Sequence, residues 1–177
     1  SLNVCYSANM TTKRNNQDMR TQEITNVSAK YWEASDYAAL EAAQTISDMT
    51  AIGLRVAARM PQPVGDVCGP ISNGGVGSIE GNLKVFRESI SRLTEEGTVI
   101  FDQMPFEAHI HRVIHDEFGQ GAKTELLEGF YRPLFESGSI QQLYFISGWE
   151  SSDGARWEHE TGQQLGLEII YLADLWT

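Results

Sequence analysis

The sequence lacks the features that mark several broad classes of protein. Its 177 residues include two cysteines, Cys5 and Cys68, too few and too far apart for a disulfide framework or a cysteine-rich zinc site. No run approaches the ~20 apolar residues of a membrane span, and no apolar segment at the start indicates a signal peptide. We therefore expect unpaired thiols, a reducing cytoplasmic location and no membrane partner.

Basic residues are also scarce. The chain has 13 Lys and Arg against 24 Asp and Glu, a net charge of −11 at pH 7. We expect no nucleic-acid partner, because such binding relies on Lys and Arg neutralising phosphates. A small anionic ligand remains compatible with this charge, because the N–H groups at a helix N-terminus bind phosphate without basic side chains.

The first third of the chain differs from the rest. Residues 3–30 are polar and predict an arm or partial disorder. Residues 36–60 predict a helix that begins at Ser35 or Asp36 and stops before Pro61, with Gly53 as a candidate break. This helix either covers the core of the domain or pairs with another subunit. It favours oligomerisation, so we expect a homodimer or a larger assembly.

Strand and helix patterns alternate from Pro63 onward, which is typical of an α/β domain with a parallel sheet. We therefore divide the chain into an N-terminal arm and helix, 1–62, and an α/β domain, 63–177. The predicted strands are 64–71, 98–101, 140–146 and 167–172, and the predicted helices are 82–97, 105–117, 123–136 and 154–165. Ligands bind outside the carboxyl ends of such strands, which directs attention to residues 69–77, 102–107 and 147–160.

The loop after the first predicted strand is rich in glycine, which lets backbone N–H groups approach a ligand closely. It is not a Walker loop, and Glu80 stands where a dinucleotide fingerprint would need its third glycine. A ligand cradle and a plain connector are both open interpretations. The candidate binding residues here are Gly69, Pro70, Ile71, Ser72, Asn73, Gly74 and Gly75.

Residues 149–160 join the third strand to the next helix. Ser152 or Asp153 is a natural N-cap, and the free N–H groups behind it would face a ligand. Glu158 follows about one turn into the helix, where its carboxylate could attack a sugar carbon while the helix start holds an anion. The alternative for Glu158 is a solvated helix glutamate. The candidate binding residues of this segment are Trp149, Ser151, Ser152, Asp153 and Gly154.

Together, residues 69–72, 101–107 and 148–160, with Gly166, resemble the nucleoside 2-deoxyribosyltransferase superfamily, and in particular a bacterial and phage branch of it. The resemblance covers residues 63–172. It implies a flavodoxin-like open parallel sheet of four to five strands with helices on both faces, preceded here by the helical extension. It also implies an enzyme without cofactor, in which Glu158 attacks the anomeric carbon of a deoxyribosyl group and the base leaves.

Two departures from the superfamily pattern refine this hypothesis. Enzymes acting on free nucleosides carry an aspartate where this chain has Ser152, which resembles instead the deoxynucleoside 5′-monophosphate N-glycosidases, where serine binds the phosphate. Asp153, one place off, could still take the aspartate role. The usual second acid does not align. We choose Asp102, at a strand end, although a loop aspartate bonding local backbone N–H groups is an equal alternative.

Other interpretations stay open at this point. His109, His111 and His115 are taken as surface or interface histidines, so we expect no metal site, although His111 and His115 share a helix face. The leading hypothesis is an enzyme that cleaves or exchanges the N-glycosidic bond of a nucleoside or its 5′-monophosphate. The alternatives are a non-catalytic nucleotide-binding or sensing module on the same fold and a flavin or redox carrier.

Overall fold

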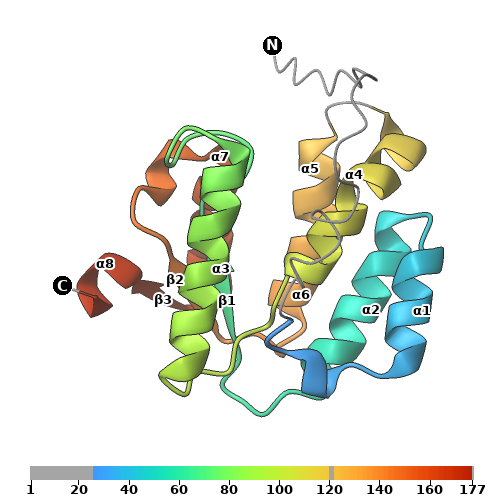
Figure 1. Ribbon diagram of the computed structural model, residues 1–177, viewed down its shortest axis with the longest axis horizontal. Helices are drawn as coiled ribbons and strands as arrows, with labels where there is room; N and C mark the ends of the chain where they lie inside the picture. Colours follow the sequence, from blue (N-terminus) through green and yellow to red (C-terminus); the bar gives the residue numbers. More distant parts are fainter. Residues whose placement is uncertain (1–25, 120–121, 177) are drawn as a thin grey trace, which may run out of the picture.

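The computed structural model describes residues 26–119 and 122–176, which form an α/β arrangement around an open parallel sheet (Figure 1). Its strands are β1 (Gly65–Cys68), β2 (Gln142–Phe145) and β3 (Glu168–Tyr171), in the order β1-β2-β3. Both pairings are parallel, and the register aligns Cys68 with Phe145 and Phe145 with Tyr171. The carboxyl ends of the three strands therefore lie at one edge of the sheet.

The sheet has three strands where we expected four to five. The predicted strand 98–101 meets β1 only at a single parallel bridge between Gly65 and Ile100. Pairing stops because the side chain of Gln103 donates its Nε2–H to the Val67 carbonyl at 2.8 Å, the acceptor that the next backbone N–H of a continuing strand would use.

Two N-terminal helices replace the single predicted helix over residues 36–60. They are α1 (Ala34–Ala42) and α2 (Ile46–Ala58), after the short 3₁₀ turn η1 (Ala29–Tyr31). The chain breaks before α2 because Thr45 and Asp48 form a capping box. The candidate break at Gly53 was wrong: Gly53 lies inside α2, where an added Cβ would be 3.3 Å from Leu134.

The remaining helices follow the predicted order with shifted ends. Between α5 and α6, the residues Leu127–Tyr131 form a π-helical turn, η2, where we expected a continuous helix. A short terminal helix, α8, was not expected. The helical elements are α3 (Ile79–Glu95), α4 (Met104–Phe118), α5 (Lys123–Leu126), η2 (Leu127–Tyr131), α6 (Arg132–Glu136), η3 (Trp149–Ser151), α7 (Asp153–Leu165) and α8 (Leu172–Leu175).

The two faces of the sheet bury different side chains, because successive residues of a strand point to opposite faces. Val67 packs with α3 on one face, whereas Cys68 joins the larger core built by α1, α2, α4, η2 and α6. Figure 1 shows α3 against the strands and these other helices grouped beside them. By the same alternation Asp66 shares the face of Cys68, so a carboxyl group is directed into the larger core.

The apolar face of α2 is covered within the chain itself. Ile46, Met49, Ile52 and Val56 are all buried in the larger core. The helix thus covers the core, as one of our two interpretations held; assembly into a dimer or larger oligomer stays a prediction. The arm expected over residues 3–30 falls mainly outside the described residues, as does Cys5. Within the described part of the chain, no helix has the length and apolar character that a bilayer crossing needs.

Candidate active site

Glu158 lies on the inward face of α7. Ala155, Glu158 and Thr161 form the buried stripe of this helix, and Glu158 is 6% exposed. The carboxyl group lies beside the thiol of Cys68, the last residue of β1, so it faces the carboxyl end of that strand. The alternative of a solvated helix glutamate was therefore wrong. Carboxylates are rarely buried this deeply without a role, because burial penalises their charged form.

The surroundings of Glu158 favour its neutral form. Burial raises its pKa well above the ordinary range of a glutamate, and the nearby carboxyls of Asp66 and Glu107 raise it further. The Cys68 thiol and the Lys123 ammonium oppose this shift. The thiol itself is free and buried, with a raised pKa caused first by burial, which agrees with an inert core cysteine.

Asp66 is the least compensated charged group of the site. Its side chain is fully buried in β1, and neither carboxylate oxygen has a hydrogen-bond partner among residues 26–119 and 122–176. Burial raises its pKa well above the ordinary range; the Val67 amide opposes this but falls short of hydrogen-bonding geometry. The surroundings of this carboxyl favour its protonated form, because ionisation without a partner is costly.

Glu107 and Tyr131 complete the group of ionisable side chains. Glu107 lies in the first turn of α4 and is partly exposed. Burial raises its pKa to about 7, against the opposing effect of the Tyr131 hydroxyl. The phenol of Tyr131 is buried among Glu107, Glu158, Asp66 and Cys68, and its own pKa is raised, first by burial and then by these carboxyls.

The start of α7 contacts the glycine-rich loop. Ser152 is buried and caps the helix, its Oγ accepting the Ala155 N–H at 3.4 Å. The preceding residue, Ser151, accepts the Gly75 N–H at 2.9 Å on its Oγ. The structure thus brings together the two loops that the sequence singled out, one after β1 and one after β2.

Asn82 fixes the shape of the glycine-rich loop. Its Oδ1 accepts the Val76 N–H at 2.9 Å, and its Nδ2 donates to the carbonyls of Ile71 and Gly74 at 3.1 and 3.2 Å. Gly75 has a φ of +62°, and an added Cβ would lie 2.3 Å from Asn82 Oδ1. Glycine is therefore required there by both backbone conformation and space.

The other predicted residues of this loop have mixed surroundings. A Cβ on Gly69 would lie 3.0 Å from Ile146, so this glycine serves close packing. Pro70 is buried and Ser72 is exposed. The Oδ1 atom of Asn73 is buried and has no hydrogen-bond partner in the described residues.

Lys123 brings a positive charge to the start of α7. Its Nζ lies 3.9 Å from Oδ2 of Asp153, and a Cβ added to Gly154 would be 3.5 Å from its Cε. Asp153 is exposed and also pairs with Arg156. A cation next to exposed helix N–H groups is the chemistry that suits an anionic ligand.

Trp149 packs against Phe145, the strand neighbour of Cys68, with ring centroids 5.1 Å apart. It stacks on His159 with ring centroids 4.3 Å apart and an interplanar angle of 17°, and His159 Nε2 lies 2.7 Å from the Tyr171 hydroxyl. Trp149 therefore forms part of a wall over the edge of the sheet, and His159 points away from Glu158.

Asp102 has the surroundings of our alternative interpretation. Its Oδ1 accepts the Met104 N–H and its Oδ2 accepts the Val27 N–H, each at 3.0 Å. The Met104 contact is the local one that this interpretation describes, whereas Val27 lies 75 residues away in the sequence; both oxygens hold backbone. Glu128 and Glu136, the other acids near the third strand, both pair with Arg132 at the surface.

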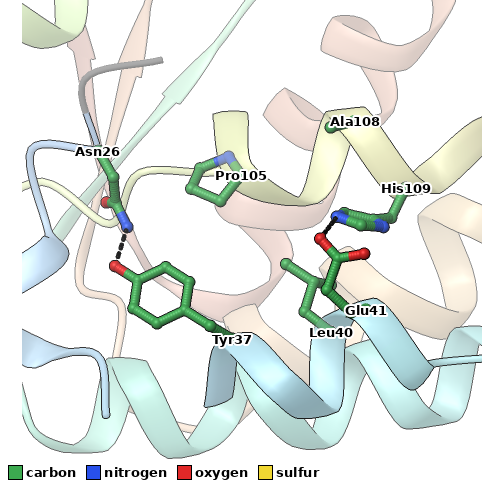
Figure 2. A pocket seen from close by; sticks show the side chains of 7 residues that line it. All are labelled: Asn26, Tyr37, Leu40, Glu41, Pro105, Ala108 and His109. Carbon is green, nitrogen blue, oxygen red and sulfur yellow. Dashed lines mark hydrogen bonds and ion pairs between the residues drawn. The ribbon is translucent and has the colours of Figure 1, made fainter. Parts of the chain in front are cut away.

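One pocket of about 230 Å³ lies between α1 and α4 (Figure 2). Tyr37 and Leu40 line it from one side and Pro105 and His109 from the other, and none of the predicted site residues contributes. His109 Nε2 lies 3.6 Å from Glu41 across this pocket. Residues 26–119 and 122–176 contain no group of three or more His, Cys, Asp or Glu side chains that could hold a metal ion.

Sequence reasoning missed four residues of this site: Asp66, Asn82, Glu107 and Lys123. The charge of Asp66 inside an otherwise apolar strand was a usable signal, because such a residue must be buried. Glu107 lay within a segment that we selected, but its sequence does not show that it turns toward Tyr131. Lys123 and Asn82 gave no signal, because their roles arise from contacts with distant segments.

No family model matches this chain, and comparisons with curated proteins and with solved structures also gave no match.

Proposed function

We propose that this protein is an enzyme that cleaves or exchanges the N-glycosidic bond of a deoxynucleoside or its 5′-monophosphate, with Glu158 as nucleophile. One observation carries the proposal: Glu158 is buried on the inward face of α7, at the carboxyl end of β1, six residues after the buried Ser152 cap. The nucleophile and the anion-binding helix start thus belong to one helix, as the resemblance to the nucleoside 2-deoxyribosyltransferase superfamily requires.

The strand order supports a flavodoxin-like arrangement. The segment 98–101 can be counted as the remnant of a second strand, because Ile100 bridges to Gly65. The neighbours across the sheet are then 98–101, β1, β2 and β3, which are the second, first, third and fourth strands in chain order. This is the flavodoxin-like order without its fifth strand, and ligands in such sheets bind beside the first strand, where the order reverses. Glu158 lies at that point.

The chemistry follows from the charges around Glu158. Because burial favours its neutral form, Glu158 would first lose its proton to solvent as substrate binds. The ionised carboxylate would then attack C1′ as the base departs, and the sugar would pass through a cation-like transition state. The carboxyls of Asp66 and Glu107 lie close enough to Glu158 to act on it through their charge. When ionised, they place fixed negative charge in a region shielded from water. Such fixed groups stabilise developing positive charge more strongly than water does.

A 5′-phosphate is the favoured anionic group of the substrate. The Ser152 hydroxyl, the N–H groups that begin α7 and the Lys123 ammonium lie close together at one end of the helix. Lys123 also acts on Glu158 through its charge, so a substrate bound here would have its phosphate near Lys123 and its C1′ near Glu158.

Incubation with each of the four deoxynucleoside 5′-monophosphates, followed by chromatography for free base, tests the proposal. We expect release from at least one of them, or exchange when a free nucleoside and an acceptor base are supplied instead. Absence of any released or exchanged base would contradict the enzymatic function.

A non-catalytic nucleotide-binding module is the second candidate. The observation that favours it is Asp102, whose two oxygens are both engaged by backbone N–H groups, so the acid that we first chose is not free. This candidate predicts nucleotide binding that survives Glu158→Ala, measured by calorimetry, without turnover in the wild type.

A further inference from the structure

Glu107 and Glu158 approach β1 from its two sides. Glu107 is in the first turn of α4, directly after the segment that bridges to Gly65. Glu158 is in α7, after β2, the other neighbour of β1. Since parallel strands end at one edge of a sheet, these two connections meet over the carboxyl end of β1.

Tyr131 links the two glutamates. It ends the π-helical turn η2, which packs against α7, and its buried hydroxyl lies among Glu107, Glu158 and Asp66. The turn is held by Thr50, whose Oγ1 donates to the Gly129 carbonyl at 2.7 Å. Such turns are rare and occur often at functional sites, where they place a side chain that a regular helix would direct elsewhere.

The two glutamates differ in their access to solvent. Glu158 is 6% exposed, whereas Glu107 is only partly buried and can exchange protons with water. Its pKa of about 7 means that both protonation states are populated at neutral pH. A residue that gives a proton in one step and takes it back in the next works best under these conditions.

We propose that Glu107 is the acid–base residue that acts with the Glu158 nucleophile; this inference rests on the proposed function. In the first step the C1′–N bond breaks, its electron pair leaves with the base, the Glu107 proton moves to the base, and a Glu158 oxygen bonds to C1′. In the second step water bonds to C1′, its proton passes to Glu107, and the electron pair of the ester C–O bond returns to Glu158. The products are free base and 2-deoxyribose 5-phosphate, with both glutamates restored.

The test compares two leaving groups in the variant Glu107→Gln. With a deoxynucleoside monophosphate, kcat should fall by about 10²- to 10⁴-fold, because the base needs a proton to leave. With 4-nitrophenyl 2-deoxyribose 5-phosphate, glycosylation of Glu158 should stay within about threefold of wild type, since nitrophenolate leaves unprotonated. The burst of nitrophenolate also shows that the variant is folded. Glu107→Asp should retain more activity on the natural substrate than Glu107→Gln.

Glu88→Gln serves as the matched control, because Glu88 is an exposed glutamate of α3 that pairs only with Lys84. If Glu107→Gln cleaves the monophosphate at the wild-type rate, or slows both substrates equally, the acid–base role is overturned while the proposed function stands. If the wild type releases no base from any substrate, both fall together.

Discussion

Two buried aspartates show how differently two regions of this molecule treat charge. Asp36, in α1, is fully buried, but its carboxylate forms ion pairs with Arg59 and with Arg55, whose Nη2 lies 3.2 Å from Oδ1. It also accepts a hydrogen bond from the Glu33 backbone N–H. Asp66, in β1, is equally buried and has no partner for either oxygen in the described part of the chain. Burial by itself raises the pKa of both aspartates. At Asp36 the Glu33 amide and the two guanidinium groups outweigh burial, so the pKa is lowered. At Asp66 burial prevails, so the pKa is raised.

This difference distinguishes charges that stabilise the fold, around Asp36, from charges that serve the proposed site, around Asp66. Between α1 and α2, opposite charges are in contact and the cost of burial is offset. At the carboxyl end of β1, the carboxyls of Asp66 and Glu107 both act on Glu158 through their charge. The Lys123 ammonium opposes them and lies 3.9 Å from Asp153. Strongly perturbed groups without partners are typical of sites whose compensating charge arrives with a ligand.

The largest expected effect comes from Glu158→Gln. Removing the nucleophile should lower base release by at least about 10³-fold. The fold should keep its stability, because the variant replaces a buried carboxyl with a neutral group of the same shape. Rates and urea denaturation curves measure the two effects. Glu160→Gln, an exposed change two residues further along α7, should leave both unchanged. An equal loss of activity in this variant would contradict the specific role of Glu158.

Asp36→Asn should show the reverse pattern. We expect the free energy of unfolding to fall by about 2 kcal/mol at pH 7, because charged hydrogen bonds of a buried group are lost. The kcat of the remaining folded protein should not change. The folded pKa of Asp36 is lowered, so its contribution is present above the ordinary pKa of aspartate and is lost as the pH falls through the folded value.

Urea denaturation at several pH values checks this prediction, with Glu41→Gln on the same helix as control. A variant as stable as the wild type at pH 7 would show that the Asp36 contacts contribute nothing net.

Lys123→Met tests the role of the cation at the start of α7. The KM for a deoxynucleoside 5′-monophosphate should rise by about tenfold, the effect of one charged contact of about 1.4 kcal/mol. The KM for the corresponding free nucleoside should not change, because it has no phosphate. Steady-state kinetics on both substrates, with Lys84→Met in α3 as control, would reject this role if the two KM values rose together.

The smallest expected effect is a gain in stability in Asp66→Asn. The folded pKa of Asp66 is raised, so the group favours folding fully below its unfolded pKa, and this contribution is lost as the pH rises toward the folded value. The variant should be more stable than wild type by about 1 kcal/mol at pH 8. Its stability should also fall less between pH 5 and pH 8.

The exposed change Asp116→Asn on α4 controls for net charge in that measurement. A loss of stability at pH 8 in Asp66→Asn would mean that the carboxyl has a compensating interaction, and the contrast with Asp36 would disappear.

Local sequence signals predicted the elements of this fold better than their ends. Three of the four strands predicted after Pro63, and the helices α3, α4 and α7, were correct in type and order, because periodicity and caps such as Ser152 and Gly166 act locally. The short pairing of 98–101 was not predictable, since it depends on the Gln103 side chain reaching Val67. The break before α2 was readable from Thr45 and Asp48, whose spacing forms a capping box.

The site was predictable only in part for the same reason. Glu158 and Ser152 lie six positions apart on one helix, so their relation follows from local geometry. The contact of Tyr131 with Glu107 joins α4 to a π-helical turn, and no local pattern predicts it. We could not predict the surroundings of Asp102, because the backbone N–H that Val27 donates to its Oδ2 comes from a residue far away in the sequence.

Trapping of the covalent intermediate tests the central role of Glu158 most directly. The protein is incubated with a 2′-fluoroarabino deoxynucleoside 5′-monophosphate, in which fluorine slows both steps, and is then quenched, digested and analysed by mass spectrometry. We predict a sugar phosphate attached to the peptide that contains Glu158, absent from the Glu158→Gln variant. Base release accompanied by an adduct on another residue, or by none even at early quench times, would contradict nucleophilic catalysis by Glu158.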